Sequence, residues 1–435
     1  MNRPIAVDLF AGAGGLSLGL EQAGFDIAAA VEIDPIHAAI HKLNFPYSAV
    51  ICSDVKELTG DDLRRAAGLG RTPIDAVVGG PPCQGFSLIG HRVLRDPRNS
   101  LVFHFVRLVA ELRPRTFVME NVPGIATGKH TQLLDELVAQ LEGCGYSVRV
   151  PVQTLNAAHF GVPQDRRRLF LLGSRNGIAL SDYPEAKTSP PLNGRRASKQ
   201  QELGFTARPL TPTVGDALDD LPNIDDYDYL FDSDELRATP NGGGEYALLL
   251  RGEGADPMDF SYRRRWESKI LTGCRRARHT QLSRRRFANA TPGTTEPVSR
   301  FFRLAEDGLC NTLRAGTASD RGAFSAPRPI HPRWPRCISV REAARIHAFP
   351  DWFRFHHTIW HGFRQIGNSV PPLLARAVGE TLMATLAAKP SRPRRHLDLG
   401  PAELARLNMR QAAAYFGVSH HVIPPRTRGT EPTKR

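Results

Sequence analysis

Short apolar runs separated by amphipathic stretches recur along the first 180 residues. The apolar runs begin near residues 5, 27, 49, 75, 116, 147 and 169, and each has the length of one β-strand. Between them, stretches such as 101–112 and 132–141 carry apolar residues at helical spacing. Strands that alternate with helices are typical of a sheet with helices on both faces. We therefore predict an α/β fold with a doubly wound, mostly parallel sheet over residues 1–180.

The periodic pattern weakens after residue 180. Residues 181–209 are rich in Pro, Ser, Arg and Lys, which indicates a linker or insertion. The chain up to residue 315 has little periodicity and predicts a second, smaller irregular domain, with a disordered insertion as the alternative. Helical patterns return at Ser339–Phe349, with Ser339 as N-cap, and at Val370–Leu386. We therefore expect four units, at 1–180, 181–315, 316–388 and 389–435.

Composition agrees with a soluble intracellular protein. The 435 residues are 41% hydrophobic, which is enough for at least one large core and two domains. No apolar run has the length of a membrane span, and Met1–Pro4 leads directly into the first strand, which leaves no room for a signal peptide. The six cysteines show no close spacing, so we expect a reducing compartment, the cytoplasm, and no disulfide or metal site.

The first strand leads into a glycine-rich turn. Ile5–Phe10 is the strand and Ala11–Gly15 is the turn, which allows a ligand to approach the backbone closely. A dinucleotide fingerprint would have a third glycine where Ser17 stands. The turn therefore indicates a nucleoside cofactor that lacks a pyrophosphate.

Acidic residues follow the next two strands. Glu32, at the end of the second strand, is a candidate for accepting ribose hydroxyls, and Asp54 could accept a hydrogen bond from an adenine amine. Each acid alone is more often a solvated strand end or a helix cap. Because ligands bind at the carboxyl ends of parallel strands, the turn and the two acids together favour a cofactor site.

A cysteine stands in a loop stiffened by proline and glycine. The apolar strand at Val77–Val78 runs into Gly80–Ser87, which presents Cys83. A thiol is partly ionised at neutral pH and is a strong nucleophile, so this position suits covalent catalysis. Taken alone, a small buried cysteine would be the more common explanation.

The chain resembles the DNA (cytosine-5)-methyltransferases that use S-adenosylmethionine. The resemblance covers residues 1–180 and about 310–385, in the family's order, at Asp8–Gly15, Gly80–Ser87, Glu120–Val122, Gln164–Arg168, Arg341–Arg345 and Gln365–Pro372. It implies a Rossmann-like methyltransferase fold with a variable target-recognition domain. It also implies cofactor contacts from Phe10, Ala11, Gly12, Gly14, Gly15, Glu32, Ile33, Asp54, Val55, Pro82, Asn368 and Ser369.

The resemblance also implies a covalent mechanism on a cytosine that is flipped out of duplex DNA. Cys83 would add to C6 so that C5 can accept the methyl group. Glu120 would be protonated and donate to N3, which requires a pKa raised by burial. Arg166 and Arg168, which alternation along an extended segment places on one face, would contact O2 and the neighbouring backbone. The base that removes the C5 proton is not identified.

Positive charge is concentrated in two regions of this chain, whose net charge is +13. Residues 261–300 hold eleven Lys or Arg and two acids, and residues 389–435 hold ten and three. Both are candidates for phosphate contact, although a charge run is usually a solvated face. Candidate DNA contacts are Gln84, Ser87, Arg263, Arg264, Arg265, Arg275, Arg276, Arg278, Arg284, Arg285 and Arg286.

In the basic tail, Leu404–Phe416 followed by Gly417 predicts a helix with a glycine stop, and a partly disordered terminus is the alternative. The tail would add nonspecific DNA affinity.

Two other functions are disfavoured by the sequence, and two remain alternatives. The missing third glycine disfavours a nicotinamide oxidoreductase, and a zinc deaminase lacks its His-x-Glu and Pro-Cys-x-x-Cys motifs here. An RNA cytosine-5 methyltransferase and a catalytically silent DNA-binding relative remain alternatives. The expected partners are double-stranded DNA and a cognate restriction endonuclease encoded nearby, and the expected role of this monomer is to protect host DNA in a bacterial restriction-modification system.

Overall fold

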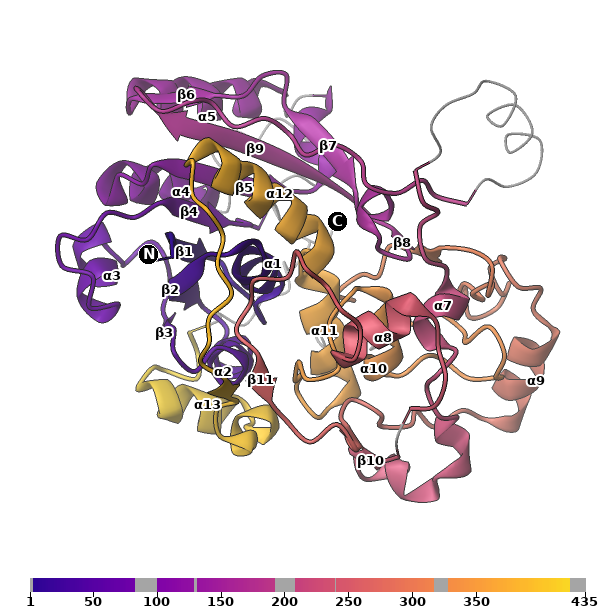
Figure 1. The fold of residues 1–435 in the computed structure, drawn as a ribbon. Helices are drawn as coiled ribbons and strands as arrows, with labels where there is room; N and C mark the ends of the chain where they lie inside the picture. Colours follow the sequence, from indigo (N-terminus) through magenta and orange to yellow (C-terminus); the bar gives the residue numbers. More distant parts are fainter. Residues whose placement is uncertain are drawn as a thin grey trace, which may run out of the picture.

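The structure of the chain is a computed structural model (Figure 1). It describes residues 3–82, 100–128, 131–191, 208–238, 240–316 and 328–422. Among these residues, no helix is both long and apolar enough to cross a membrane.

One large sheet organises the first part of the chain. Its strands follow the order β3-β2-β1-β4-β5-β9-β6, and β7 also pairs with β9. Strands β1 to β5 pair in parallel, and β9 runs antiparallel to its neighbours β5, β6 and β7. The predicted mostly parallel sheet is therefore confirmed. The strands are β1 Ile5–Leu9, β2 Asp26–Glu32, β3 Ala49–Cys52, β4 Ala76–Gly79, β5 Thr116–Asn121, β6 Tyr146–Val148, β7 Gln153–Asn156 and β9 Arg167–Arg175.

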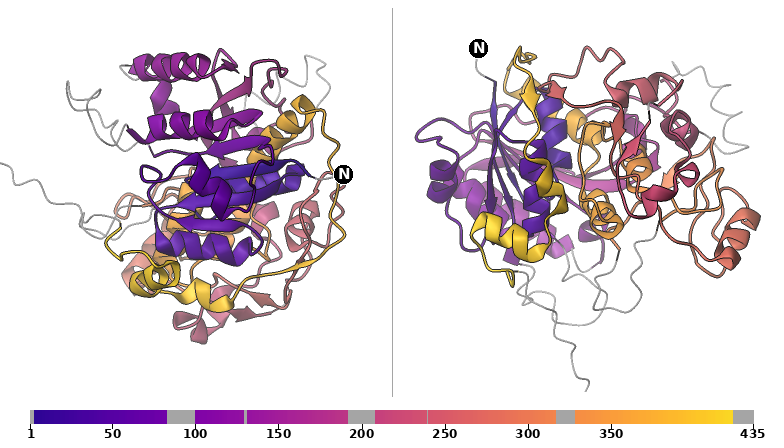
Figure 2. Two further views of the ribbon diagram at one scale, coloured as in Figure 1. Left: turned by 90° about the vertical axis from the view of Figure 1, so that its left-hand side faces the viewer. Right: turned by 90° about the horizontal axis from the view of Figure 1, so that it is seen from below.

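Helices cover both faces of this sheet (Figures 1 and 2). Alternation along each strand divides the core into two apolar clusters, so that Val77 and Val78, for example, belong to opposite clusters. Residues of α1 and α12 contribute to the cluster on one face, and residues of α3, α4 and α5 to the cluster on the other. The helices are α1 Gly15–Ala23, α2 Pro35–Asn44, α3 Gly60–Ala66, α4 Ser100–Leu112, α5 Thr131–Gly143 and α12 Pro372–Thr385, with short 3-10 helices η2 Pro123–Ala126 and η4 Ala157–Phe160.

A second part of the chain lies beside the sheet and has short elements joined by long loops (Figure 1). Buried ion pairs hold it together, because Arg345 is fully buried and binds both Asp351 and Asp220. We call residues 208–356 the irregular part. Its elements are α7 Val214–Leu218, η5 Ile224–Asp226, η6 Asp228–Phe231, β10 Leu236–Arg237, α8 Glu245–Arg251, β11 Arg264–Arg265, β12 Ile270–Leu271, α9 Gln281–Asn289, β13 Cys310–Asn311 and α10 Val340–Ile346.

Ser339 caps α10 as predicted, through a reciprocal capping box with Glu342. The helix ends at Ile346, three residues before the predicted end. Ala348 has a φ of 62°, which is incompatible with a continued helix, and Pro350 disfavours helical backbone at the residue before it. Helix α10 packs against α7. Residues of α10 share an apolar cluster with the sheet, and the chain continues through α11 (Ile359–Asn368) into α12.

The C-terminal segment is folded onto the sheet domain. Its elements are β14 Leu397–Asp398, η8 Ala402–Arg406 and α13 Met409–Phe416. The predicted glycine stop is confirmed, because Gly417 ends α13 in a left-handed conformation, but the helix begins at Met409 and Leu404 belongs to the separate 3-10 helix η8. Helix α13 packs against α2 (Figure 2). Residues 397–422 are thus folded, and the rest of the tail lies outside the described residues.

Candidate active site

The order of the strands reverses between β1 and β4, and the expected site residues follow the carboxyl ends of these two strands. Leu9, the last residue of β1, is in register with Gly79, the last residue of β4. Ligands in doubly wound sheets bind at such a switch point. The glycine turn leaves β1, and Gly80–Pro82 leaves β4 towards Cys83. The predicted site residues Cys83, Gln84 and Ser87 lie outside the described residues.

The glycine turn has the open backbone that a bound nucleoside needs. Phe10, Gly12 and Gly14 have positive φ angles of 61°, 55° and 104°. A β-carbon on Gly12 would meet no atom within 4 Å, whereas one on Gly14 would lie 2.5 Å from the Phe45 ring. One side of the turn is therefore tightly packed, and Gly12 leaves room for a ligand on the other.

Glu32 is held by two backbone donors. Its Oε2 accepts from Gly12 N at 2.8 Å and its Oε1 accepts from Asp34 N at 2.9 Å, and burial raises the pKa of the carboxyl. Each oxygen keeps lone-pair capacity for a ribose hydroxyl. The chemistry of this donor and acceptor set therefore fits a nucleoside. Asp34, by contrast, caps α2 by accepting from Ile36 N.

Ser17 has a structural role that explains why it replaces the third glycine. Its Oγ donates to Asp8 Oδ2 at 2.5 Å beneath the turn. Burial raises the pKa of Asp8 to about 7. The serine and the carboxyl together anchor the start of α1 to the end of β1.

The other predicted cofactor residues surround the same turn. A β-carbon on Gly15 would lie 2.9 Å from Ser369 Cβ and 2.4 Å from Val370 O, so the end of α11 packs directly on the turn. Asn368 is exposed there, next to the buried Ser369. At the neighbouring strand ends, Asp54 is half-buried and accepts from Lys56 N. Ala11 and Val55 are buried, Ile33 is half-buried and Pro82 is exposed.

Glu120 and Arg168 form a nearly buried ion pair beside the chain that leads to Cys83. Arg168 Nε lies 2.9 Å from Glu120 Oε1, and both side chains are about one-eighth exposed, at 13% and 12%. A β-carbon on Gly80 would lie 2.8 Å from Glu120 Oε2, so only glycine leaves room for this carboxyl. Burial raises the pKa of Glu120, although Arg168 and Arg166 act in the opposite direction. This is the direction that the sequence predicted.

Arg166 lies close enough to Glu120 and Arg168 to influence them electrostatically, but its guanidinium binds backbone carbonyls. Arg166 is fully buried and donates to three backbone carbonyls, those of Leu313, Gly367 and Ser369, each at 2.8 Å. Strand β8 (Gln164–Asp165) ends before Arg166 and β9 begins after it. Arg166 is nevertheless buried, Arg167 exposed and Arg168 half-buried, so the side chains of Arg166 and Arg168 still turn inward and that of Arg167 outward. Arg166 fastens the end of α11 and is a positioning residue.

His347 belongs to the same buried network and was not found by sequence reasoning. Its Nε2 donates to Ser369 O at 3.1 Å, and its Nδ1 therefore accepts from Gln164 Nε2 at 3.0 Å. Burial lowers its pKa well below the ordinary value, so the ring is neutral. No motif in the sequence marks this histidine, because its role depends on contacts between distant segments.

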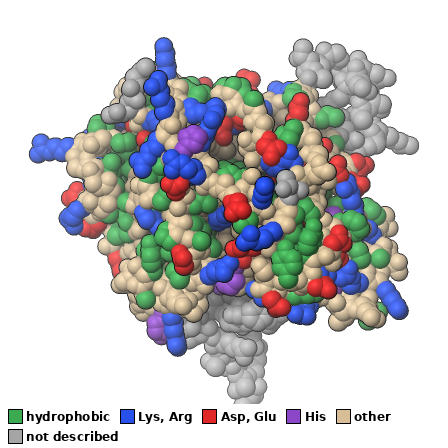
Figure 3. Space-filling model, turned by 60° about the horizontal axis from the view of Figure 1, so that its bottom comes forward, with side chains coloured by type: hydrophobic (Ala, Val, Ile, Leu, Met, Phe, Trp, Pro, Cys, Tyr) green, Lys and Arg blue, Asp and Glu red, His purple; other side chains and the backbone are tan. Residues whose placement is uncertain are grey.

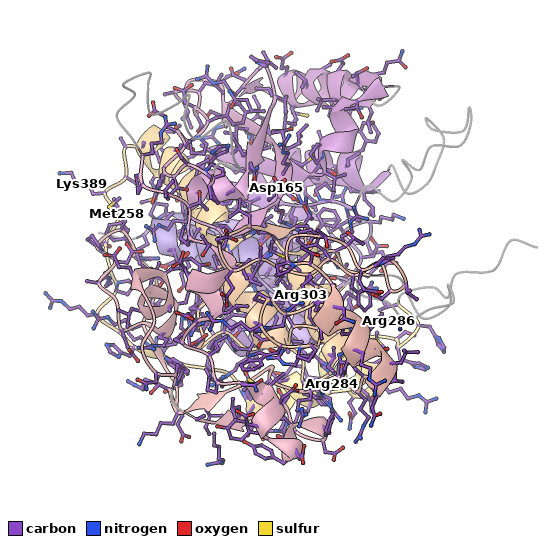
Figure 4. All side chains as sticks on the ribbon, turned by 90° about the vertical axis from the view of Figure 1, so that its right-hand side faces the viewer. Asp165, Met258, Arg284, Arg286, Arg303 and Lys389 are labelled. Atoms are coloured by element: carbon purple, nitrogen blue, oxygen red, sulfur yellow. The ribbon has the colours of Figure 1, made fainter. Side chains whose placement is uncertain are left out.

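The arginines predicted to contact DNA differ in exposure. Helix α9 carries Arg284 and Arg286, which Figure 4 shows on the side of the molecule opposite Met258 and Lys389. On the face seen in Figure 3, basic side chains are interspersed with acidic ones, so no single basic field covers it. The exposed candidates are Arg263, Arg265, Arg278 and Arg285, and the half-buried ones are Arg275, Arg284 and Arg286.

Two of the predicted DNA contacts are wrong, because the side chains are buried and paired. Arg264 is buried and donates to both oxygens of Glu21 at 2.8 and 2.9 Å. Arg276 donates to Asp228 at 2.8 Å and lies 3.2 Å from Asp225. A run of arginines does not reveal which of them have acidic partners. The acidic partner of Arg264, Glu21, lies 243 residues earlier in the chain.

The Arg264–Glu21 pair predicts a large loss of stability on truncation. Replacing Arg264 by Ala should lower the free energy of unfolding by about 3–5 kcal/mol, because the Glu21 carboxylate would remain buried without its partner. Urea-induced unfolding measures the difference. The exposed neighbour Arg263→Ala is the control, with an expected change within about 0.5 kcal/mol. Equal midpoints for the two variants would contradict the structural role of Arg264.

Residues 5–384 match the family described as C-5 cytosine-specific DNA methylase. The chain belongs to this family. The expected enzyme class, DNA (cytosine-5)-methyltransferase, is thereby confirmed. The match begins at β1 and ends in α12, so it spans the sheet domain and the irregular part and stops before the C-terminal segment.

Individual relatives agree with this assignment. The chain is 55% identical to the Type II methyltransferase M.XorII of Xanthomonas oryzae pv. oryzae over 98% of this chain and 96% of the relative. It is 31% identical to the Type II methyltransferase M.AgeI of Thalassovita gelatinovora, over 88% and 99%. A solved DNA modification methyltransferase encoded within an E. coli prophage is 34% identical with a TM-score of 0.68, over 88% of this chain and 99% of that one. The methyltransferase is thus of the type II restriction-modification kind.

Proposed function

We propose that this methyltransferase transfers a methyl group from S-adenosylmethionine to C5 of a flipped cytosine in a specific duplex DNA sequence, through a covalent adduct of Cys83. The observation that carries the proposal is the Glu120–Arg168 pair beside Gly80, which leads within three residues to Cys83. A carboxyl with a raised pKa next to a guanidinium suits a ring that accumulates negative charge.

The residues around the glycine turn would hold the cofactor. Glu32 would accept the ribose hydroxyls, and Asn368 and Ser369 would approach from the end of α11. S-adenosylmethionine supplies an electrophilic methyl group when it is bound. The missing pyrophosphate site and the Asp8–Ser17 contact under the turn support a nucleoside that carries no diphosphate.

The catalytic residues would act on the pyrimidine ring in sequence. The Cys83 thiolate adds to C6, and the protonated Glu120 donates to N3 while Arg168 contacts O2, so the negative charge is stabilised. C5 would then be nucleophilic and would take the methyl group, with cleavage of the sulfur–methyl bond and S-adenosylhomocysteine as the leaving group. After the C5 proton leaves, the electron pair re-forms the C5–C6 double bond and the Cys83 sulfur departs.

Duplex containing 5-fluorocytosine at the target position tests this proposal directly. A base cannot remove the fluorine at C5 as it would remove a proton, so elimination of the Cys83 sulfur is blocked. In the presence of S-adenosylmethionine the protein should therefore remain covalently attached to the duplex and migrate as a larger species on a denaturing gel. Methylation-sensitive sequencing of DNA from expressing cells identifies the modified base and its context. Trapping on an RNA of the same sequence, and not on DNA, would favour the alternative substrate. A catalytically silent relative would give neither result.

The exposed arginines of the irregular part should contribute to phosphate contact. Among the described residues, Arg285 has no carboxylate at ion-pair distance and lies on α9. Arg285→Ala should weaken binding to all duplexes and reduce the slope of log K against log salt by about 1. Fluorescence anisotropy over a salt series measures this slope. Arg65→Ala on α3, which lies on the opposite side of the molecule from α9 in Figure 1, is the control. An unchanged slope for Arg285→Ala would exclude the contact.

Proposals on partners follow from the relatives. Since M.XorII and M.AgeI are type II methyltransferases, we expect a restriction endonuclease of the same specificity to be encoded near this gene and the modification to protect host DNA. We expect the protein to act as a monomer in the cytoplasm.

A further inference from the structure

The C-terminal segment touches both helices that flank the proposed cofactor site. We call residues 397–422 the C-terminal strap. It lies beyond the part of the chain that matches the family, which ends at residue 384. The strap begins with β14, which pairs with β11 of the irregular part, and continues along α2 to α13 (Figure 2).

The first contact of the strap is with α2 and the glycine turn. Leu404 is 2% exposed and belongs to one apolar cluster with Ala39, Ile40 and Leu43 of α2 and with Ala13 of the turn. Gly400 N donates to Leu43 O at 2.7 Å, and a β-carbon on Gly400 would lie 3.1 Å from the Leu43 backbone. The strap therefore packs closely along α2.

The second contact is with the start of α11. His357 N donates to Ala405 O at 3.0 Å, and His356 Nε2 donates to Leu407 O at 3.1 Å. His356 is in turn bound to α11, because its backbone N donates to Gln365 Oε1 at 3.0 Å. Two strap carbonyls thus hold the chain that enters α11.

Both helices place groups in the proposed cofactor site. Helix α2 starts directly after Asp34, whose N–H holds Glu32, and α11 ends at Asn368 beside Gly15. A shift of either helix would move the ribose acceptor or the α11 end relative to the turn. The strap packs on α2, shares one apolar cluster with Ala13 of the turn, and accepts hydrogen bonds from His356 and His357, which lead into α11.

We propose that the C-terminal strap is a positioning element of the cofactor site, and that Leu404 is the residue through which it sets the affinity for S-adenosylmethionine. This inference rests on the proposed function. The sequence-based hypothesis that the basic tail adds nonspecific DNA affinity stays a separate prediction. The strap's Arg406 donates to Glu235 at 2.8 Å, and its buried side chains face the protein.

The test compares Leu404→Ala with Leu404→Met, which keeps most of the volume and the apolar contact. Isothermal titration with S-adenosylhomocysteine measures binding without turnover. The dissociation constant of Leu404→Ala should rise about tenfold, within the range of coupling through packed elements, and that of Leu404→Met should stay near the wild type. The KM for S-adenosylmethionine should rise in parallel. In contrast, kcat at saturating cofactor and the KM for DNA should change less than about twofold, because the variant weakens cofactor binding equally in the ground state and the transition state.

Arg410→Ala is the matched control, because Arg410 is exposed on α13 of the same strap. It should leave every constant unchanged. A loss of DNA affinity in Arg410→Ala with normal cofactor binding in Leu404→Ala would overturn the proposal and favour DNA contact by the strap. An equal loss of cofactor binding, DNA binding and kcat in Leu404→Ala would indicate general unfolding, and a second variant then decides.

If Leu404→Ala does not fold, His356→Ala removes only the side-chain bond to Leu407 O and should raise the same dissociation constant about threefold. An unchanged constant in His356→Ala would then reject the proposal. A wild-type protein that binds no S-adenosylhomocysteine at all would instead contradict the proposed function.

Discussion

Cys83→Ser should reduce methyl transfer to duplex DNA by about 10⁴-fold or more, because removal of a covalent nucleophile costs several orders of magnitude in kcat. A serine hydroxyl is hardly ionised near neutral pH and would not add to C6 of cytosine. Incorporation of tritium from S-adenosylmethionine labelled in the methyl group measures the loss.

The same variant should bind S-adenosylhomocysteine with normal affinity. The described groups that would hold the cofactor, Gly12, Glu32 and the end of α11, lie on other segments of the chain. Covalent trapping on 5-fluorocytosine DNA should disappear completely. Retention of more than about a tenth of wild-type turnover would exclude Cys83 as the nucleophile, since a nucleophile contributes far more than tenfold.

The sheet and the strand ends that carry the candidate site could be predicted from sequence, because both depend on local signals. Each of the seven predicted strands is present, and the turn at Gly12 and the acid at Glu32 are adjacent as expected. Strand ends in a parallel sheet meet at one edge, so placing each motif at a strand end was enough to bring them together.

The arginines could not be assigned from sequence for a physical reason. Arg166, Arg168 and Arg264 look alike in the sequence, and their roles depend on partners far away in the chain. Arg168 meets Glu120, Arg166 meets the carbonyls at the end of α11, and Arg264 meets Glu21 of α1. A buried arginine must find such partners, because an unpaired buried charge is costly. Only the fold identifies them.

The packing of the C-terminal strap could not be predicted from its composition either. Its helix was predicted from the apolar spacing and Gly417, but a basic composition suggested a solvent-exposed tail. The cations lie on the outside, and Leu404, Ala412 and Ala413 face inward. Net charge therefore described the surface of this segment and not its packing.

Glu120→Gln should slow methyl transfer by about 10²–10³-fold, which is the usual cost of removing one preorganised donor to a developing anion. The amide can still occupy the space beside Gly80, where a β-carbon would meet the carboxyl oxygen at 2.8 Å. It can donate a weaker hydrogen bond to N3 but cannot give up a proton. The KM for S-adenosylmethionine should stay within about threefold of the wild type, since a group used only in the transition state lowers kcat without changing ground-state binding.

The pH profile separates this role from a structural one. Burial raises the pKa of Glu120, so the protonated form is present below that raised pKa and is lost as the pH rises through it. Wild-type kcat should therefore fall on the alkaline side, and the Gln variant, which has no proton to lose there, should lack that fall. Arg168 can still donate to the amide oxygen of the variant but loses its carboxylate partner, so the melting temperature is measured alongside to separate any loss of stability from the loss of kcat. A fall in kcat of the same shape on the alkaline side in both proteins would assign the titration to another group. An equal loss of kcat and of cofactor affinity in the Gln variant would contradict a contact between Glu120 and N3.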